Sequence, residues 1–140
     1  MQQEKSETMI HIMLVEDHDL TRRQMASLVK NQSDMDVVAE AVNGEESLAK
    51  ARESKPDVIV MDILLPGING LDASRQLVQT LPGARILILS NHSGAALVQA
   101  ALGVGVLGYV RKDHAFEELV PAIRSVFAGR QFLGEKITER

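Results

Sequence analysis

Short apolar runs alternate along the chain with stretches in which apolar residues recur every three or four positions. Each run has the length of a strand and is rich in Val, Ile and Leu, which is typical of strands in a parallel sheet covered on both faces. The runs expected to form strands are 10–15, 36–41, 57–61, 86–89 and 108–110. Helical spacing follows each of them, so strand and helix alternate five times, which indicates a doubly wound α/β domain.

The expected helices cover 20–32, 44–54 and 71–81, an Ala-rich stretch after the fourth strand, and 114–128. Asp19 is placed to cap the first of them. In the last helix, Phe116, Leu119 and Ile123 belong to the apolar stripe that should face the sheet. Pro121 lies inside this helix and should kink it or remove one backbone hydrogen bond.

The composition is that of a soluble globular protein, with 45% hydrophobic and 24% charged residues in a chain of 140. The absence of cysteine excludes disulfides and thiolate metal sites and agrees with a cytoplasmic location. A net charge of -4 gives no general attraction to nucleic acid or to an anionic membrane. Residues 86–110 lack Asp, Glu, Lys and Arg, but polar residues and glycines interrupt them, so they predict strand, helix and strand rather than a membrane span.

Polar residues follow four of the predicted strands at their carboxyl ends. They are Glu16 and Asp17, Asp62, Ser90, and Lys112. In an open parallel sheet these ends point the same way, so residues far apart in the sequence meet in one crevice. Three carboxylates, a hydroxyl and an ammonium would converge there. This combination suits an acidic metal site at which an aspartate takes up a phosphoryl group.

Several strings of residues fall in the order of one family's landmarks. They are Leu14-Val15-Glu16-Asp17, Val60-Met61-Asp62 with Pro66-Gly67 and Asn69-Gly70, Leu89-Ser90, and Gly108-Tyr109-Val110-Arg111-Lys112. Together they resemble the receiver domain of bacterial two-component response regulators, over about residues 10–129. Residues 108–113 and 128–133 further resemble the NarL/FixJ (LuxR-type) subfamily of transcription factors. The resemblance implies a flavodoxin-like fold with a five-stranded parallel sheet in the order 2-1-3-4-5.

The resemblance also implies a set of roles in phosphoryl transfer. Asp62 would be the phosphoacceptor, because a carboxylate at an exposed strand end can attack phosphorus. A Mg²⁺ ion would be held by Asp17, Asp62 and the backbone carbonyl of Leu64, with Glu16 acting mainly through water. Lys112 would neutralise the phosphoryl oxygens as a point charge. Alone, each of these residues could equally be a turn, cap or solvated strand-end residue.

Ser90 and Tyr109 would form a switch. The Ser90 hydroxyl would donate a hydrogen bond to a phosphoryl oxygen, and Tyr109 matches the aromatic position whose ring turns inward as that hydroxyl moves. The alternative for Tyr109 is a partly buried strand aromatic. Leu64 is apolar at a position from which the family tunes attack by water, so we expect slow self-dephosphorylation. Asn91 is bulkier than the small residue that many receivers place after the hydroxyl.

We expect residues 1–9 to form a flexible tail, 10–129 the receiver domain, and 130–140 the start of a linker to an output domain absent from this chain. The resemblance implies a sensor histidine kinase as phosphoryl donor and a phosphorylation-dependent homodimer. DNA would be bound only through the output domain, and no membrane contact is expected. The protein would not be an enzyme in the ordinary sense, although it would promote its own phosphorylation and dephosphorylation.

Three other functions remain open. A pseudo-receiver would keep the fold and bind partners without phosphate, but the complete acidic set argues against it. A phosphatase with an aspartate nucleophile would place a second aspartate two residues after Asp62, where this chain has Leu64. A flavin or nucleotide binder would want a Gly- or Thr-rich loop after the first strand, whereas Glu16-Asp17-His18-Asp19 would repel phosphate.

Overall fold

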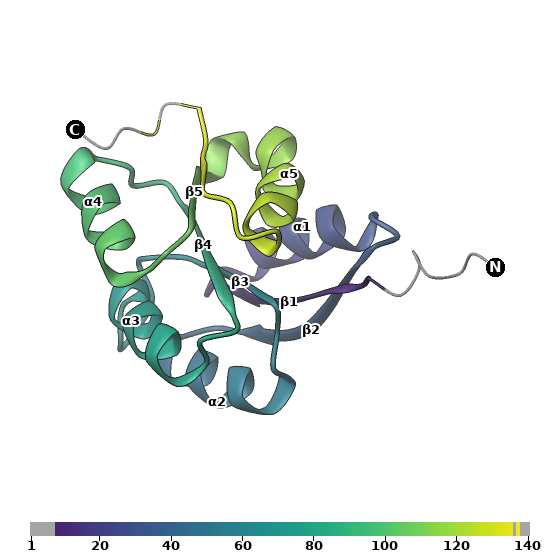
Figure 1. Cartoon of the computed structure of the whole chain (residues 1–140), viewed down its shortest axis with the longest axis horizontal. Helices are drawn as coiled ribbons and strands as arrows, with labels where there is room; N and C mark the ends of the chain where they lie inside the picture. Colours follow the sequence, from purple (N-terminus) through teal and green to yellow (C-terminus); the bar gives the residue numbers. More distant parts are fainter. Residues whose placement is uncertain (1–7, 136, 138–140) are drawn as a thin grey trace.

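The computed structural model describes residues 8–135 and 137 of the chain. Strands and helices alternate through the fold, as the apolar pattern predicts (Figure 1). The strands are β1 (Ile10–Val15), β2 (Met35–Ala41), β3 (Val58–Met61), β4 (Arg85–Ser90), β5 (Gly108–Arg111) and β6 (Phe132–Leu133). The helices are α1 (Asp19–Lys30), α2 (Gly44–Ser54), α3 (Gly70–Thr80), α4 (Ala95–Val104) and α5 (Ala115–Phe127), with a short 3-10 turn, η2 (Lys112–His114), before α5.

All the strands pair in parallel, in the order β2-β1-β3-β4-β5-β6. The expected order 2-1-3-4-5 is correct, but the expected number of five strands is wrong because β6 joins the free edge of β5. Gly129, with φ +83°, turns the chain back after α5. The Phe132 N–H then donates to the Leu107 carbonyl at 3.1 Å, and the Gly134 N–H donates to the Tyr109 carbonyl at 2.9 Å. A strand of two residues leaves no periodic pattern in a sequence.

The sheet separates two apolar cores. Helices α1 and α5 cover one face, and α2, α3 and α4 cover the other (Figure 1). Residues 12–15 of β1 and 58–61 of β3 are fully buried, because side chains from both faces of these strands point into a core. This burial explains why the strands read as unbroken apolar runs.

Helix α5 packs through most of the predicted stripe, since Leu119 and Ile123 are fully buried and the partly buried Val120 and Phe127 pack against the same core. Its buried residues are Leu119, Ala122, Ile123 and Val126, whereas Phe116 is 82% exposed. Pro121 lies inside α5, which continues through it, so the backbone bond that its missing N–H would make is absent.

Helix α1 lacks the predicted cap. Its N-cap residue is His18, which makes no side-chain capping bond, and Asp19 lies inside the first turn, where it accepts a hydrogen bond from Arg22 at 2.7 Å. Asparagine caps are used instead at α2 and α3, where Asn43 accepts from the Glu46 N–H and Asn69 from the Asp72 N–H.

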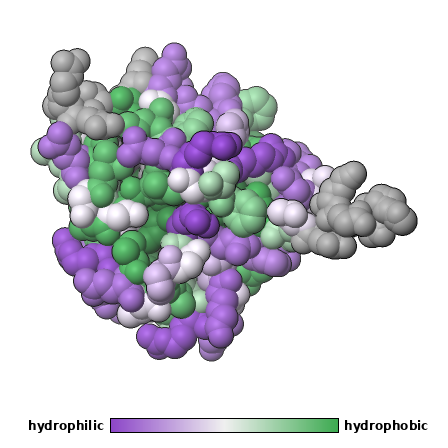
Figure 2. All heavy atoms as spheres, viewed as in Figure 1, coloured by the Kyte–Doolittle hydropathy of each residue, from purple (hydrophilic) through white to green (hydrophobic). Residues whose placement is uncertain are grey.

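The described helices differ in the surface that they present. Helix α4 contains no charged residue, and apolar side chains gather in its region of Figure 2, whereas hydrophilic ones cover α2. Within the residues that the structure describes, no helix has both the length and the apolar character needed to cross a membrane.

Candidate functional site

Glu16, Asp62 and Lys112 meet beyond the carboxyl ends of β1, β3 and β5. The Lys112 Nζ lies 2.6 Å from Glu16 Oε1 and 2.9 Å from Asp62 Oδ2. The Glu16 side chain is fully buried, and those of Asp62 and Lys112 are 6% and 15% exposed. The structure therefore brings together three of the predicted residues from three separate parts of the sequence.

Backbone contacts fix the two carboxylates at the ends of their strands. The Glu16 N–H donates to the Ala41 carbonyl at 3.0 Å, and the Asp62 N–H donates to the Val15 carbonyl at 3.1 Å, so each strand ladder extends one residue into the site. Asp62 Oδ1 accepts the N–H of Ile63 at 2.7 Å. Asp62 is thus oriented by its own loop on one oxygen and by Lys112 on the other.

A glycine allows the loop after Asp62 to close. The Gly70 N–H donates to the Ile63 carbonyl at 2.8 Å, which brings the first residue of α3 against the end of β3. A Cβ atom at position 70 would overlap the Asp62 carbonyl oxygen and the Cα of Ile63. The Asn69-Gly70 pair, read from the sequence as a tight turn, therefore supplies a helix cap and the space for this contact.

Burial and the ammonium group act in opposite directions on the carboxyl groups. Burial raises the pKa of Asp62, although Lys112 partly opposes this effect. Burial also acts to raise the pKa of Glu16, but Lys112 and the His18 N–H outweigh it and hold that pKa below its ordinary value. For Lys112, burial acts to lower the pKa, and the bonds to Glu16 and Asp62 raise it above its ordinary value. Glu16 and Lys112 are therefore charged at neutral pH.

Asp17 carries an oxygen that suits a cation. Its Oδ1 is buried without a hydrogen-bond partner, and the nearest ring nitrogen of His18 is 3.5 Å away. Glu16, Asp17 and His18 can each offer one ligand atom within 4.8 Å of the other two. An unpartnered carboxylate oxygen beside a second carboxylate fits Mg²⁺, which prefers oxygen ligands. Glu16 and Asp17 thus offer oxygen ligands of the kind that the expected ion takes, whereas Asp62, which pairs with Lys112, is not part of this group.

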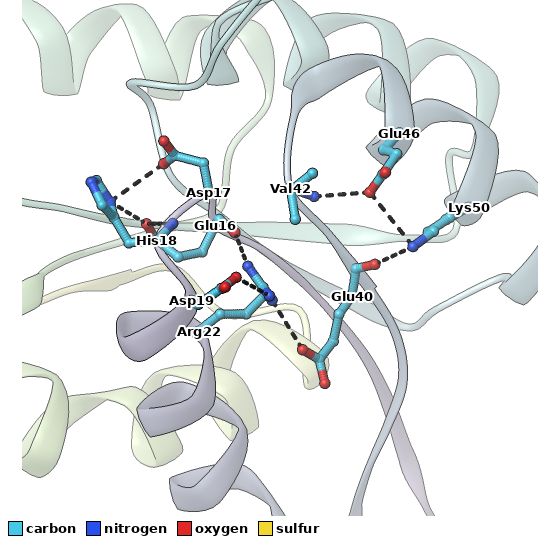
Figure 3. Close-up of polar contacts among 9 residues, drawn as sticks. All are labelled: Glu16, Asp17, His18, Asp19, Arg22, Glu40, Val42, Glu46 and Lys50. Atoms are coloured by element: carbon cyan, nitrogen blue, oxygen red, sulfur yellow. Dashed lines mark hydrogen bonds and ion pairs between the residues drawn. The ribbon is translucent and has the colours of Figure 1, made fainter.

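Arg22 and His18 support Glu16, a role that the sequence analysis did not predict for either residue. His18 donates its N–H to Glu16 Oε2 at 3.0 Å, and its Nδ1 lies 3.0 Å from the same oxygen. Arg22 donates to the Glu16 carbonyl at 2.8 Å and also binds Asp19 and Glu40 (Figure 3). The i,i+3 spacing of Asp19 and Arg22 could have predicted an ion pair on α1, but nothing in the sequence predicts the contact of Arg22 with Glu40.

Ser90 and Tyr109 both contact the loop between β4 and α4. The buried Ser90 Oγ accepts the His92 N–H at 3.1 Å, and the hydroxyl of Tyr109 donates to the His92 carbonyl at 2.5 Å. Arg111 donates to the Asn91 carbonyl and to Ser93 Oγ, which holds the loop from the β5 side. The Tyr109 ring is fully buried, and burial together with the Asp62 charge raises its pKa to about 12.

Leu64 lies two residues after Asp62 and exposes 59% of its surface. The metal-binding role predicted for its backbone carbonyl, like the roles of the other site residues, stays a prediction.

Comparisons with known proteins agree on one family. The model of the response regulator receiver domain matches residues 12–124. The chain is 38% identical over 132 residues to the response regulator GacA of Pseudomonas viridiflava, covering 94% of this chain and 62% of that protein. It is 33% identical to the response regulator UvrY of Escherichia coli strain K12, covering 94% of this chain and 61% of that protein. The chain thus spans about three fifths of the length of these curated relatives.

Solved structures give the same result. A two-component response regulator of the LuxR family from Aurantimonas sp. SI85-9A1 has a TM-score of 0.88 at 40% identity, with 92% of each chain covered. The signal receiver domain of the putative response regulator NarL from Mycobacterium tuberculosis has a TM-score of 0.83 at 28% identity, covering 87% of this chain and 98% of that chain. The chain therefore belongs to the response regulator receiver domain family of two-component systems, in its NarL/FixJ branch.

Proposed function

We propose that this receiver domain takes a phosphoryl group onto Asp62. The observation that carries the proposal is the position of Lys112, whose ammonium holds one oxygen of a nearly buried aspartate at 2.9 Å. Asp62 is thereby fixed at a strand end, and a cation is already in place for the charge that a phosphoryl group would bring. Positioning and charge neutralisation are the main devices of protein-assisted phosphoryl transfer.

In the proposed step, a carboxylate oxygen of Asp62 attacks phosphorus while the bond from phosphorus to the donor breaks. With a phosphohistidine donor, the P–N bond breaks, its electron pair remains on the imidazole nitrogen and the phosphoryl group moves to oxygen. Lys112 would then pair with a phosphoryl oxygen. The Ser90 Oγ accepts a hydrogen bond from His92, which leaves its hydroxyl hydrogen to donate to another phosphoryl oxygen.

Asp17, Asp62 and the Leu64 carbonyl would hold Mg²⁺, with Glu16 acting through water. When bound, the ion supplies charge neutralisation of the phosphoryl oxygens. The buried, unpartnered Asp17 Oδ1 supports this assignment. The domain would promote its own phosphorylation and dephosphorylation through these groups.

The partners of the domain are also proposals. The donor would be a sensor histidine kinase in the cytoplasm, and the uncharged helix α4 supports a phosphorylation-dependent homodimer. DNA would be bound through an output domain, with 10–129 as the receiver unit and 130–140 as the start of a linker whose first residues also pair with the sheet as β6. The names of relatives support this, since one is the transcriptional regulatory protein LnrK of Bacillus subtilis, 35% identical over 59% of its length. The expected tail at 1–9 lies almost wholly outside the described residues.

Intact-mass analysis after incubation with acetyl phosphate, with and without Mg²⁺, tests the acceptor. We expect one phosphoryl adduct that needs the metal and is absent from Asp62→Asn. Asp57→Asn is the matched control, because Asp57 lies just before β3, at the opposite end of the same strand, and is 36% exposed. The control should be phosphorylated normally. No adduct, together with no Mg²⁺ binding, would favour the phosphate-independent pseudo-receiver.

A further inference from the structure

A second group of possible metal ligands lies where η2 and α5 meet the segment after β6. It consists of His114, Glu118 and Glu135, each offering one ligand atom within 4.8 Å of the other two. The Nδ1 of His114 is 3.6 Å from Glu135 Oε1. His114 is the last residue of η2, and Glu118 lies in the first turn of α5. The group shares no residue with the site at Asp62.

The Glu118 carboxylate is only half satisfied. Its Oε2 accepts the N–H of Glu135 at 2.9 Å, which fixes the orientation of the group. Its Oε1 is buried and has no hydrogen-bond partner. A buried carboxylate oxygen without a donor is unfavourable, and a cation beside it would remove this cost.

Gly134 makes room for this carboxylate. A Cβ atom at position 134 would overlap Glu118 Oε1. The Gly134 N–H meanwhile donates to the Tyr109 carbonyl at 2.9 Å, so the segment cannot move away without losing a bond to the sheet. Glu135 is therefore held beside Glu118 and His114 by the pairing of the preceding residues.

We propose that His114, Glu118 and Glu135 bind a divalent transition-metal cation of the Zn²⁺ class. One imidazole and two carboxylates form a ligand set that zinc accepts, whereas Mg²⁺ prefers oxygen ligands alone. The two carboxylates also balance the charge of the ion. Three protein ligands leave a further position for water. The bound ion would join the start of α5 to the chain that leaves β6.

Isothermal titration of the whole chain with ZnCl₂, in excess Mg²⁺, tests the site. We expect one high-affinity Zn²⁺ per chain, with affinity at least tenfold lower in both His114→Gln and Glu135→Gln. His11→Gln is the matched control, because this histidine is 47% exposed and lies in β1 beside Asp57. The control should bind zinc as the unaltered chain does.

Two results would overturn the proposal. One is unchanged zinc affinity in both His114→Gln and Glu135→Gln. The other is loss of zinc binding in His18→Gln with retention in His114→Gln, which would place the ion beside Glu16 and Asp17. The Glu135 side chain is 71% exposed, so Glu135→Gln keeps the test valid if His114→Gln fails to fold. Zinc should also raise the unfolding temperature of the unaltered chain and not that of the two variants.

Discussion

Lys112 places one ammonium between two buried carboxylates, so the charge balance of the site depends on a single side chain. Its contacts with Glu16 and Asp62 raise its pKa even though burial acts in the opposite direction. Without this ammonium, two negative groups would face each other away from water. Such an arrangement is unstable unless a proton or a cation enters.

Replacing Lys112 by Met should therefore destabilise the metal-free domain. We expect the free energy of unfolding in urea at neutral pH to fall by about 3 kcal/mol, because one partner of a buried ion pair is removed. Added Mg²⁺ should restore part of this loss. Lys30→Met is the control, since Lys30 is exposed in the last turn of α1 and its replacement should change stability by no more than about 0.5 kcal/mol. Equal losses in the two variants would contradict the prediction.

Tyr109 can be titrated directly because the chain has one Tyr and no Trp. Burial and the Asp62 charge raise its pKa to about 12, above the ordinary value of 10.0. The neutral phenol is favoured in the folded state, so this contribution to stability is complete below pH 10 and is lost as the pH rises through about 12. Phenolate absorbance followed against pH should give a midpoint near 12 while circular dichroism reports a folded domain. A midpoint at the ordinary value in the folded domain would show that the ring is accessible to water.

Leu64 should protect the aspartyl phosphate from water. Leu64 is 59% exposed two residues after Asp62, and its side chain offers no group to orient an attacking water. We expect Leu64→Asn to shorten the phosphoryl lifetime several-fold, measured by the decay of the adduct in intact-mass spectra. Leu20→Asn, at a 66% exposed leucine on α1, should leave the lifetime unchanged. A lifetime in Leu64→Asn as long as that of the unaltered chain would exclude this role.

At the scale of elements, the loop from β3 to α3 depends on the absence of a side chain at Gly70. A Cβ there would overlap the Asp62 carbonyl oxygen, which is backbone and cannot rotate away. We expect Gly70→Ala to lower the free energy of unfolding by about 2 kcal/mol or more. Gly83→Ala is the control, because nothing lies within 4 Å of a Cβ at that position. Equal midpoints of urea unfolding for the two variants would show that the loop adapts.

The sequence predicted the five longer strands and all five helices to within a few residues because their apolar patterns are long and their turns carry Gly, Pro and Asn. The predictions failed where several residues fit the same spacing and tertiary packing decides which of them is buried or caps a helix. Phe116 fits the apolar spacing of α5, but Ala122 and Val126 face the sheet instead. Asp19 fits a cap, but its carboxylate pairs with Arg22.

At the scale of the whole molecule, β6 adds an edge to the sheet. Ending the chain after Gly129 should remove at least two backbone hydrogen bonds to the β5 side, together with the apolar contacts of Phe132 and Leu133. We expect the free energy of unfolding to fall by about 2 kcal/mol. A chain ending after Ile137 keeps β6 and the packing of Ile137 against the core, and it should retain the stability of the full chain in urea. If both shortened chains lose stability equally, β6 contributes nothing.

The candidate site was predictable because parallel strands align their carboxyl ends, so Glu16, Asp62 and Lys112 had to approach one another. The residues that support these three side chains could not be predicted from the sequence. Arg22 donates hydrogen bonds to both the Glu16 carbonyl and the Glu40 carboxylate. The Ser90 Oγ accepts a hydrogen bond from the His92 N–H in the loop that follows β4. Contacts of this kind depend on side-chain conformations in the folded molecule and leave no spacing in the sequence.

Tyr109 makes hydrogen bonds through both its side-chain hydroxyl and its backbone carbonyl. Its hydroxyl holds the carbonyl of His92, ahead of α4, and its backbone carbonyl holds the N–H of Gly134, on the segment that leaves the sheet. Tyr109 therefore links the loop between β4 and α4, next to the acidic crevice, to the segment that follows β6. A movement of the loop that displaced the Tyr109 ring would therefore also strain the backbone hydrogen bond that holds Gly134.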